Sequence, residues 1–263
     1  MTTLVLSPHA DDAALSIGGS LLLQAYPTPV TVVTVFSQSS FGYGQLCADT
    51  HAVTAKRHEE DAAFAALCSA HLLSLDFPDA PLRLGPGAET VFASGPSEAV
   101  LQPEELEQRL ARVVADAEVS CLLAPLGLGC HFDHLLVQRA AVALAREHAL
   151  ELILYEDLPY AVHHSREQIT AQAGLIDPDF APLEIPIEGV MAAKLKALKC
   201  YPSQLGEVDA SAVRLHARRC HPHRHAFSWL TQRRAAYERV WVLGRPRWLQ
   251  AARRLRGSGA LLE

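Results

Sequence analysis

Thr3-Leu4-Val5-Leu6-Ser7-Pro8-His9-Ala10-Asp11-Asp12 is an apolar run that ends in a histidine and two adjacent aspartates. The apolar part is short and predicts a buried strand, and the residues from Asp11 to Leu23 have the apolar spacing of a helix. The histidine and both carboxylates therefore lie at the turn between a strand and a helix. Ligands of open α/β sheets bind beyond the carboxyl ends of the strands, so this turn is a candidate site.

The chain continues to alternate strands and helices up to about residue 160. Thr31–Phe36 is β-branched and continuous, which is typical of a strand buried on both faces. Further strands are predicted over Leu72–Phe77, Ser120–Pro125, Glu151–Tyr155 and Ile185–Ile187, and helices over Val53–Ala70, Glu104–Ala117, His131–His148, Met191–Lys199 and Arg233–Glu238. Ser37–Cys47 and Pro78–Pro96 are predicted to be irregular. This order predicts a Rossmann-like α/β fold in three layers, with a mostly parallel sheet flanked by helices.

The length and the rhythm of the chain predict one domain over residues 1–263. Residues 1–160 are expected to form its α/β core. Residues 161–263 are less regular and are expected to form a C-terminal extension of the same domain.

The composition is that of an ordinary globular protein, with 49% hydrophobic and 20% charged residues. The net charge of −6 offers no basic field to nucleic acid or to an anionic membrane. No apolar run reaches the roughly 20 residues of a membrane-spanning helix, and the N-terminus carries no charged leader. The six cysteines include no C-x-x-C pair, which fits reduced thiols. We therefore expect a cytoplasmic protein that binds neither nucleic acid nor membranes.

A second cluster, Gly129-Cys130-His131-Phe132-Asp133-His134, follows the predicted strand Ser120–Pro125. Two strand ends that each supply histidine and carboxylate predict one divalent metal ion held between them. Zinc accepts imidazole nitrogen and carboxylate oxygen, and a catalytic zinc site keeps one position open for water. The alternative is two capped helix starts with incidental histidines. The presence of both clusters in one chain favours the metal site.

The residue types also predict a division of roles. One of Asp11 and Asp12 binds the ion, and the other removes a proton from the bound water, whose pKa a metal ion lowers to about 7. One of His131 and His134 completes the metal site, and the other donates a proton beside the reacting carbonyl. Asp133 orients an imidazole and favours its charged form. The spacing does not say which aspartate binds the ion.

Together the two clusters resemble the signature of the PIG-L/LmbE-like family of zinc-dependent N-acetyl-sugar deacetylases. Three further segments resemble later elements of that family: Arg57-His58-Glu59-Glu60, the stretch from Lys194 to Gln204, and Tyr237-Glu238. The chain departs from the family pattern at Ala10 and at Ala13. It also departs from it at Tyr201, a position at which a histidine is common in the family.

The resemblance implies a role for each residue of the two clusters. It implies His9, Asp12 and His134 as metal ligands, with Zn2+ as the default ion and Fe2+ as another divalent ion that suits them. It implies Asp11 as the general base and His131 as the acid that stabilises the oxyanion and protonates the leaving amine. Asp133 would hold an imidazole. Arg57 would contact the substrate.

The resemblance further implies a hydrolase that removes an N-acetyl group from an amino sugar or its glycoconjugate, giving acetate and a free amine. The partner is then a small N-acetylated sugar or glycoconjugate, and association into a homo-oligomer is expected. Two alternatives stay open: a metallohydrolase that acts on a different amide, and a non-catalytic relative that binds sugar or metal. His221-Pro222-His223-Arg224-His225 is read as a solvated loop. Tyr160 and Glu156 are read equally well as substrate contacts or as packing residues.

Overall fold

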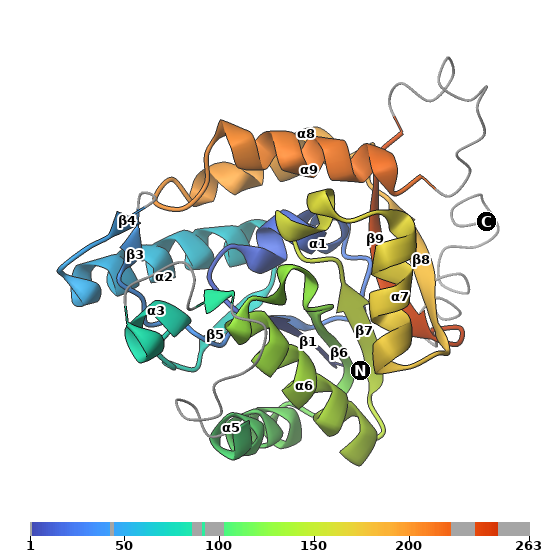
Figure 1. Ribbon diagram of the computed structural model, residues 1–263, viewed down its shortest axis with the longest axis horizontal. Coiled ribbons are helices and arrows are strands. Elements are labelled where there is room, and N and C mark those ends of the chain that lie inside the picture. The colour runs from blue at the N-terminus through green and yellow to red at the C-terminus, as the bar shows by residue number, and fades with distance from the viewer. Residues whose placement is uncertain (1, 43–44, 86–90, 93–102, 222–234, 247–263) are drawn as a thin grey trace.

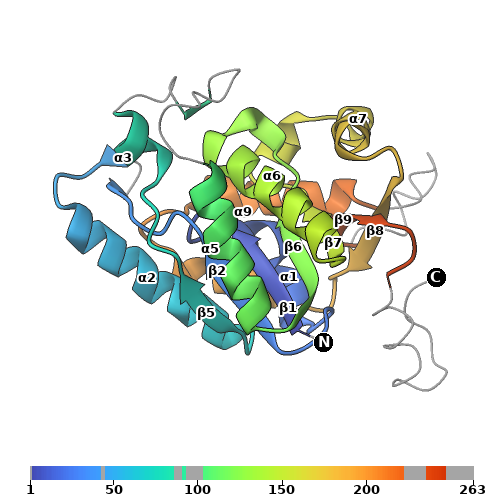
Figure 2. The ribbon, with the colours of Figure 1, turned by 90° about the horizontal axis from the view of Figure 1, so that it is seen from below.

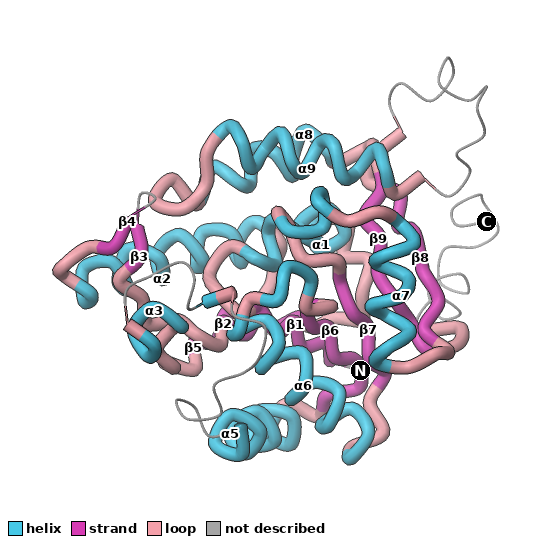
Figure 3. Tube along the Cα trace, in the orientation of Figure 1, coloured by secondary structure: helices cyan, strands magenta, loops and turns pink. Residues whose placement is uncertain are grey.

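The computed structural model describes residues 2–42, 45–85, 91–92, 103–221 and 235–246 (Figure 1). Its central element is a seven-stranded sheet, coloured magenta in Figure 3. The strand order is β5 (His71–Ser74), β2 (Val30–Thr34), β1 (Thr2–Ser7), β6 (Val119–Pro125), β7 (Glu151–Tyr155), β9 (Tyr237–Leu243) and β8 (Phe180–Pro186).

The first five strands of this order run parallel, and β9 is antiparallel to both of its neighbours. In the centre of the sheet, Val5 of β1 lies between Val32 of β2 and Leu123 of β6. The predicted, mostly parallel α/β fold is therefore confirmed. Since β8 and β9 extend the same sheet, strands from both sides of residue 160 share it. The single domain stays a prediction.

Helices cover both faces of the sheet (Figures 1 and 2). One face carries α1 (Asp12–Leu22), α2 (Thr50–Leu67), α8 (Met191–Ala197) and α9 (Glu207–Arg219), and the other carries α5 (Pro103–Asp116) and α6 (Phe132–Glu147). The short helix α3 (Ala80–Leu84) and α7 (Arg166–Ile176) lie at the edges of this arrangement. A sheet covered on both faces explains the continuous apolar runs of β1, β2 and β6.

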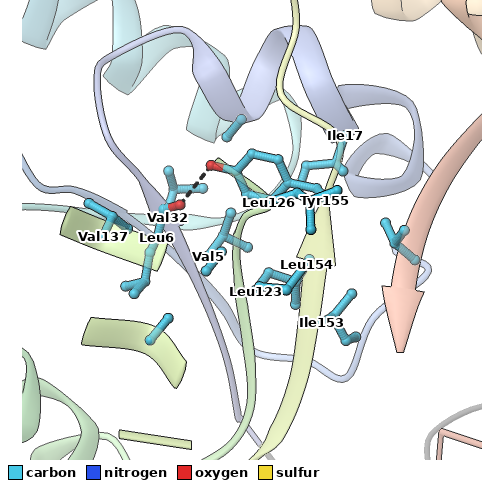
Figure 4. Packing of buried hydrophobic residues seen from close by; sticks show 14 of the residues in the cluster. Val5, Leu6, Ile17, Val32, Leu123, Leu126, Val137, Ile153, Leu154 and Tyr155 are labelled. Atoms are coloured by element: carbon cyan, nitrogen blue, oxygen red, sulfur yellow. Dashed lines mark hydrogen bonds between the residues drawn. The ribbon is translucent and has the colours of Figure 1, made fainter. Parts of the chain in front are cut away.

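The core fills the space between these layers, as the close view of Figure 4 shows for residues of β1, β6 and β7. Val5, Leu6 and Tyr155 are fully buried. The hydroxyl of Tyr155 donates a hydrogen bond of 2.8 Å to the carbonyl oxygen of Leu6, so the ring is packed and its polar atom is satisfied (Figure 4). This packing fixes the carboxyl ends of β1 and β7, from which the candidate site is built.

Three local predictions need correction. The segment Ser37–Cys47 contains a small hairpin of β3 (Phe41–Gly42) and β4 (Gln45–Leu46), and Pro78–Pro96 contains α3. The predicted helix Arg233–Glu238 is wrong at its end, because Tyr237 begins β9. Pairing with β7 and β8 outweighs the weak helical preference of a short segment. Helices α7 and α9 were not predicted.

Helix α1 is interrupted at Ile17, and a buried ion pair supports it there. The backbone N–H groups of Gly19 and Ser20 donate to the carboxylate of Glu238 at 2.7 Å each. Lys194 of α8 donates to the same carboxylate at 2.6 Å, and both side chains are buried. A Cβ atom at residue 19 would lie 2.8 Å from Oε1 of Glu238, so any larger residue would have to displace that carboxylate. Lys194 and Glu238 come from the two late segments that resemble the family, and both thus stabilise α1.

Replacing Lys194 with methionine is expected to lower the free energy of unfolding by roughly 3–5 kcal/mol, because Glu238 keeps a buried charge without its counter-ion. Urea denaturation measures the change. Lys196→Met is the matched control, since Lys196 lies on the same helix and is exposed. Equal unfolding midpoints for the two variants would show that the buried pair contributes nothing.

Within the described ranges, no helix combines the length and the hydropathy that crossing a membrane requires.

Candidate metal centre

The two predicted clusters meet because β1 and β6 are neighbours in the sheet and end at the same edge. Hydrogen bonds within the first turn fix its shape. The hydroxyl of Ser7 donates to the carbonyl of His9 at 2.6 Å and accepts from the N–H of Ala13 at 3.1 Å. Asp12 accepts from the backbone N–H of His9 at 2.8 Å. The turn therefore directs His9 and Asp12 toward the start of α6.

His9, Asp12 and His134 each offer a ligand atom, and the three atoms lie within 4.8 Å of one another. Oδ2 of Asp12 lies 3.3 Å from Nδ1 of His9 and 3.3 Å from Nε2 of His134. Asp12 and His134 are buried, and the side chain of His9 is 14% exposed. The structure thus brings together the three residues for which the resemblance implied metal binding.

A second carboxylate holds each imidazole from its other side. Asp133 lies 2.8 Å from Nε2 of His9, and Asp157 lies 2.7 Å from Nδ1 of His134. Asp133 is itself fixed by Arg83, at 2.6 Å, and by the N–H of Ala80, at 2.9 Å. Carboxylates in this position set the tautomer and the orientation of metal-binding histidines. The imidazole that Asp133 contacts is that of His9.

The charges of this cluster favour bound positive charge. Burial lowers the pKa of His9, but hydrogen bonds and charges from Asp12 and Asp133 outweigh it and raise the pKa to about 9. Burial likewise opposes ionisation of His134, yet Asp12 and Asp157 raise its pKa well above the usual value. Despite burial, the charge of His134 holds the pKa of Asp12 well below its usual value. Buried carboxylates around two imidazoles thus form a site for a cation.

The donor set fits a divalent metal ion. Nε2 of His134 is buried and makes no hydrogen bond, as a nitrogen that awaits a metal would. Two imidazoles and one carboxylate leave room for water in a four-coordinate site. His9, His131 and Asp133 form a second, overlapping group, but Asp133 is already paired with Arg83. The group of His9, Asp12 and His134 fits an ion better.

Asp11 stands beside this cluster with a free carboxylate. Among the described residues, no group donates a hydrogen bond to its side chain, which lines a pocket. Burial, together with the charge of Asp12, raises the pKa of Asp11 to about 7, although Arg57 and His9 oppose the shift. A carboxylate with this pKa is suited to accept a proton at neutral pH. Arg57 is buried, donates to Ser39 at 3.0 Å and lines the same pocket.

His131 is held as a neutral imidazole. Burial, followed by the charges of His9 and His134, lowers its pKa to about 3. Its Nδ1 accepts a hydrogen bond of 3.2 Å from the backbone N–H of Asp133, so the ring proton is assigned to Nε2. A neutral imidazole with Nε2–H is a hydrogen-bond donor. Asp133 thus fixes His131 through its backbone N–H, whereas its carboxylate contacts His9 and favours the charged form of that imidazole.

The pocket above the cluster has a volume of about 390 Å³. His9, Asp11 and Asp12 contribute to its floor. Its walls include Phe41, Phe92 and Tyr160, and further residues from α3 and from the segment that leads into α9. Tyr160 therefore faces the pocket. Aromatic walls above a polar floor suit a sugar ring that presents a reactive polar group.

The sequence-based reading missed two residues of the site, Asp157 and Arg83. Asp157 follows β7 at the same sheet edge as the two clusters, and this position was the available signal. Its second oxygen accepts from the N–H groups of Gly127 and Leu128, at 2.9 and 3.1 Å. Asp157 thereby links His134 to the loop that precedes His131. Nothing in the sequence connects Arg83 with Asp133, which lies fifty residues later.

Replacing Asp157 with asparagine is expected to weaken metal binding by roughly 10- to 100-fold. The amide has a single oxygen, so the variant either loses the loop N–H bonds or presents an N–H to Nδ1 of His134. The second case moves the ring proton to Nε2, where the metal would bind. Calorimetric titration of metal-depleted protein measures the affinity. Asp179→Asn, at an exposed position, is the control, and equal affinities in the two variants would contradict the role.

The segments 57–60 and 194–204, which also resemble the family, contribute hydrogen bonds that join elements of the fold around the pocket. Glu60 accepts from the N–H and the hydroxyl of Ser203, at 3.0 and 2.6 Å. Tyr201 is buried and donates to Asp61 at 2.7 Å, so it does not reach the pocket as a substrate contact. These bonds attach the segment before α9 to α2. They fix one wall of the pocket.

A third group with suitable ligand atoms, Glu156, His216 and Cys220, lies away from the pocket. Glu156 is buried, and Arg239, Trp241 and His216 all contact its carboxylate. A guanidinium on that carboxylate disfavours a second cation. Glu156 is therefore a packing residue, which resolves that alternative. The segment 221–225, read as a solvated loop, lies outside the described residues from position 222 onward.

A carboxylate without a hydrogen-bond donor among the described residues, beside a candidate cation site in a pocket of an α/β fold, is typical of metal-dependent hydrolases. The model of the PIG-L family, described as GlcNAc-PI de-N-acetylase, matches residues 4–145, which contain both clusters. The chain belongs to this family.

Known relatives agree with this assignment. A 2'-N-acetylparomamine deacetylase of Streptomyces fradiae is 34% identical over 228 residues, covering 84% of this chain and 80% of the relative. The structure of a deacetylase in complex with teicoplanin has a TM-score of 0.70 at 24% identity, covering 92% of this chain and 98% of the other. A teicoplanin deacetylase in a zinc-inhibited form has a TM-score of 0.69 at 22% identity, covering 92% and 97%.

These comparisons confirm the predicted family and the predicted reaction class, N-deacetylation of amino sugars. The solved structures support the fold. The geometry of the cluster fits a divalent metal. The roles of the individual residues, the identity of the ion and the oligomeric state stay predictions.

Proposed function

We propose that this chain is a divalent-metal-dependent deacetylase that hydrolyses the acetamide of an N-acetylated amino sugar or glycoconjugate. The observation that carries the proposal is the Asp11 carboxylate, which lines the pocket next to the cation site formed by His9, Asp12 and His134. The likeness to a 2'-N-acetylparomamine deacetylase supports an amino sugar as the substrate. The aromatic residues of the pocket wall support a ring-shaped substrate.

In this proposal His9, Asp12 and His134 hold the ion, which we take to be Zn2+ by default. When bound, a divalent ion supplies a Lewis acid and lowers the pKa of a water molecule to about 7. Asp133 and Asp157 keep the two imidazoles in the tautomers that ligation needs. Arg57, near Asp11, favours the ionised form of that carboxylate.

Asp11 accepts a proton from the attacking water as the oxygen–carbon bond to the acetamide carbonyl forms. His131 donates a hydrogen bond through Nε2–H to the oxyanion that develops on that carbonyl, and its neutral form suits this task. The proton taken by Asp11 is then available to the leaving nitrogen as the carbon–nitrogen bond breaks. The products are acetate and a free amine. The resemblance implies that His131 also protonates the leaving amine. We propose instead that His131, as a neutral imidazole, donates only the hydrogen bond to the oxyanion, and that Asp11 returns the proton.

Acetate release from N-acetylated amino sugars by the purified enzyme tests the proposal. Treatment with a chelator, followed by its removal, is expected to abolish turnover, and one equivalent of a divalent ion is expected to restore it. Zn2+ and Fe2+ are compared separately and at increasing excess, since one relative is known in a zinc-inhibited form. Unchanged turnover after complete metal removal would refute metal dependence. Turnover of other amides only would favour the alternative amidohydrolase, and bound metal without turnover would favour the non-catalytic relative.

A further inference from the structure

The pocket carries more carboxylate than the proposed reaction uses. Besides the residues at the cation site, Asp79 and Asp209 line its walls. Among the described lining residues the sole lysine or arginine is Arg57. Its guanidinium donates to Ser39, and its charge acts on nearby carboxylates at the floor and in α2. The walls away from the floor therefore bear negative charge that no described lining residue of opposite sign offsets.

The two additional aspartates differ in what they are free to do. Asp79 is 2% exposed and caps α3, where its Oδ1 accepts from the N–H of Leu82. Asp209 is partly exposed, and its Oδ2 accepts from the N–H of Gly206 at 2.8 Å. No described residue bonds to Oδ1 of Asp209. One oxygen of Asp209 thus holds the carboxylate in place at the pocket wall, and among the described residues the other oxygen has no hydrogen-bond partner.

The surroundings of Asp209 suit a sugar. Phe41 and Phe92 line the same pocket and are 37% and 43% exposed, which is high for phenylalanine. Gln204, between η3 (Leu198–Cys200) and α9, donates to the carbonyl of Phe41 at 3.1 Å and connects the hairpin with the segment that carries Asp209. Exposed aromatic faces pack against the C–H faces of sugar rings. A fixed carboxylate that lines the same pocket is suited to a protonated amine.

We propose that Asp209 is a specificity-determining residue, and that its carboxylate receives a protonated amine of the substrate. The amine is distinct from the acetamide that is cleaved. The enzyme then prefers an N-acetylated sugar that is linked to an amine-bearing ring over a neutral N-acetylglucosaminide. This inference rests on the proposed deacetylase function.

Steady-state kinetics on two substrates test the inference. 2'-N-acetylparomamine carries amines on its second ring, whereas methyl N-acetylglucosaminide is neutral. Asp209→Asn is expected to raise KM for the cationic substrate by about tenfold or more, because a charge-assisted hydrogen bond to the amine is lost. Its kcat, and both constants for the neutral substrate, are expected to stay within about twofold. The asparagine oxygen still accepts from Gly206, so the start of α9 is preserved.

Glu207→Gln is the matched control, because it removes the same charge from the same helical turn at an exposed residue that does not line the pocket. Raising the ionic strength is expected to increase KM for the cationic substrate more in the wild type than in Asp209→Asn. An equal loss on both substrates would show that Asp209 supports only the fold of the pocket. No loss, or an equal effect of Glu207→Gln, would also overturn the inference.

Calorimetric binding of the free amine paromamine separates this inference from the proposed function. If neither substrate is deacetylated, the proposed function fails. Binding still decides the role of Asp209: weaker binding in Asp209→Asn, with unchanged binding in Glu207→Gln, supports the amine contact. Equal affinity in the wild type and both variants refutes it.

Discussion

Replacing Asp11 with asparagine is expected to lower kcat by about 10²- to 10⁴-fold, which is the usual contribution of a positioned general base. The amide is nearly isosteric with the carboxylate but does not accept a proton at neutral pH. The content of bound metal is expected to stay the same, because His9, Asp12 and His134 remain in place. Acetate release and elemental analysis on one preparation measure both quantities.

Asp116→Asn is the control for this change, since Asp116 is exposed at the end of α5, away from the pocket. The structure supports Asp11 as the base because its carboxylate lines the pocket and has a raised pKa, whereas Asp12 faces two imidazoles. Full activity of Asp11→Asn would show that another group takes the proton. Loss of metal together with activity would instead make Asp11 a ligand.

Replacing His9 with alanine is expected to remove the bound metal and, with it, all measurable turnover. A site of two imidazoles and one carboxylate loses a third of its protein ligands in this variant. The fold is expected to survive, because Asp133 keeps its hydrogen bonds to Arg83 and to the N–H of Ala80. Asp12 likewise keeps its contact with the imidazole of His134. Elemental analysis after dialysis measures the metal, and thermal unfolding of metal-depleted protein tests the fold.

His148→Ala provides the control for His9→Ala, because His148 is exposed at the far end of α6. Like the unaltered protein, it is expected to bind one ion per chain. A His9→Ala protein that retains full metal occupancy would remove the proposed centre. The metal ligands would then have to be sought among other residues, including those outside the described ranges.

The short-range features of the fold were predictable because each is determined by neighbouring residues. The apolar runs of β1, β2, β6 and β7 and the helical spacing of α2, α5 and α6 are strong local signals, and the structure follows them within a few residues. The weak points were short elements such as the β3–β4 hairpin. There, propensity is small and pairing with distant residues decides the outcome.

In the C-terminal part, too, contacts with distant residues decided a structure that the local sequence did not predict. The predicted helix Arg233–Glu238 instead leads into β9, whose first residues pair with β8 and whose centre pairs with β7. Glu238 then reaches α1 and Lys194 in α8, more than forty residues away in sequence. No local pattern contains these partners. Only the completed sheet brings them together.

For the site, the sequence by itself supplied the residue types that bind a cation and the sheet edge at which they gather, since parallel strands end together and their following turns must meet. The tertiary structure decided the rest. It showed which aspartate faces the imidazoles, that Asp157 and Arg83 complete their surroundings, and that Asp209 lines the pocket. These are distances between side chains from different elements, and they depend on how helices pack on the sheet rather than on spacing along the chain.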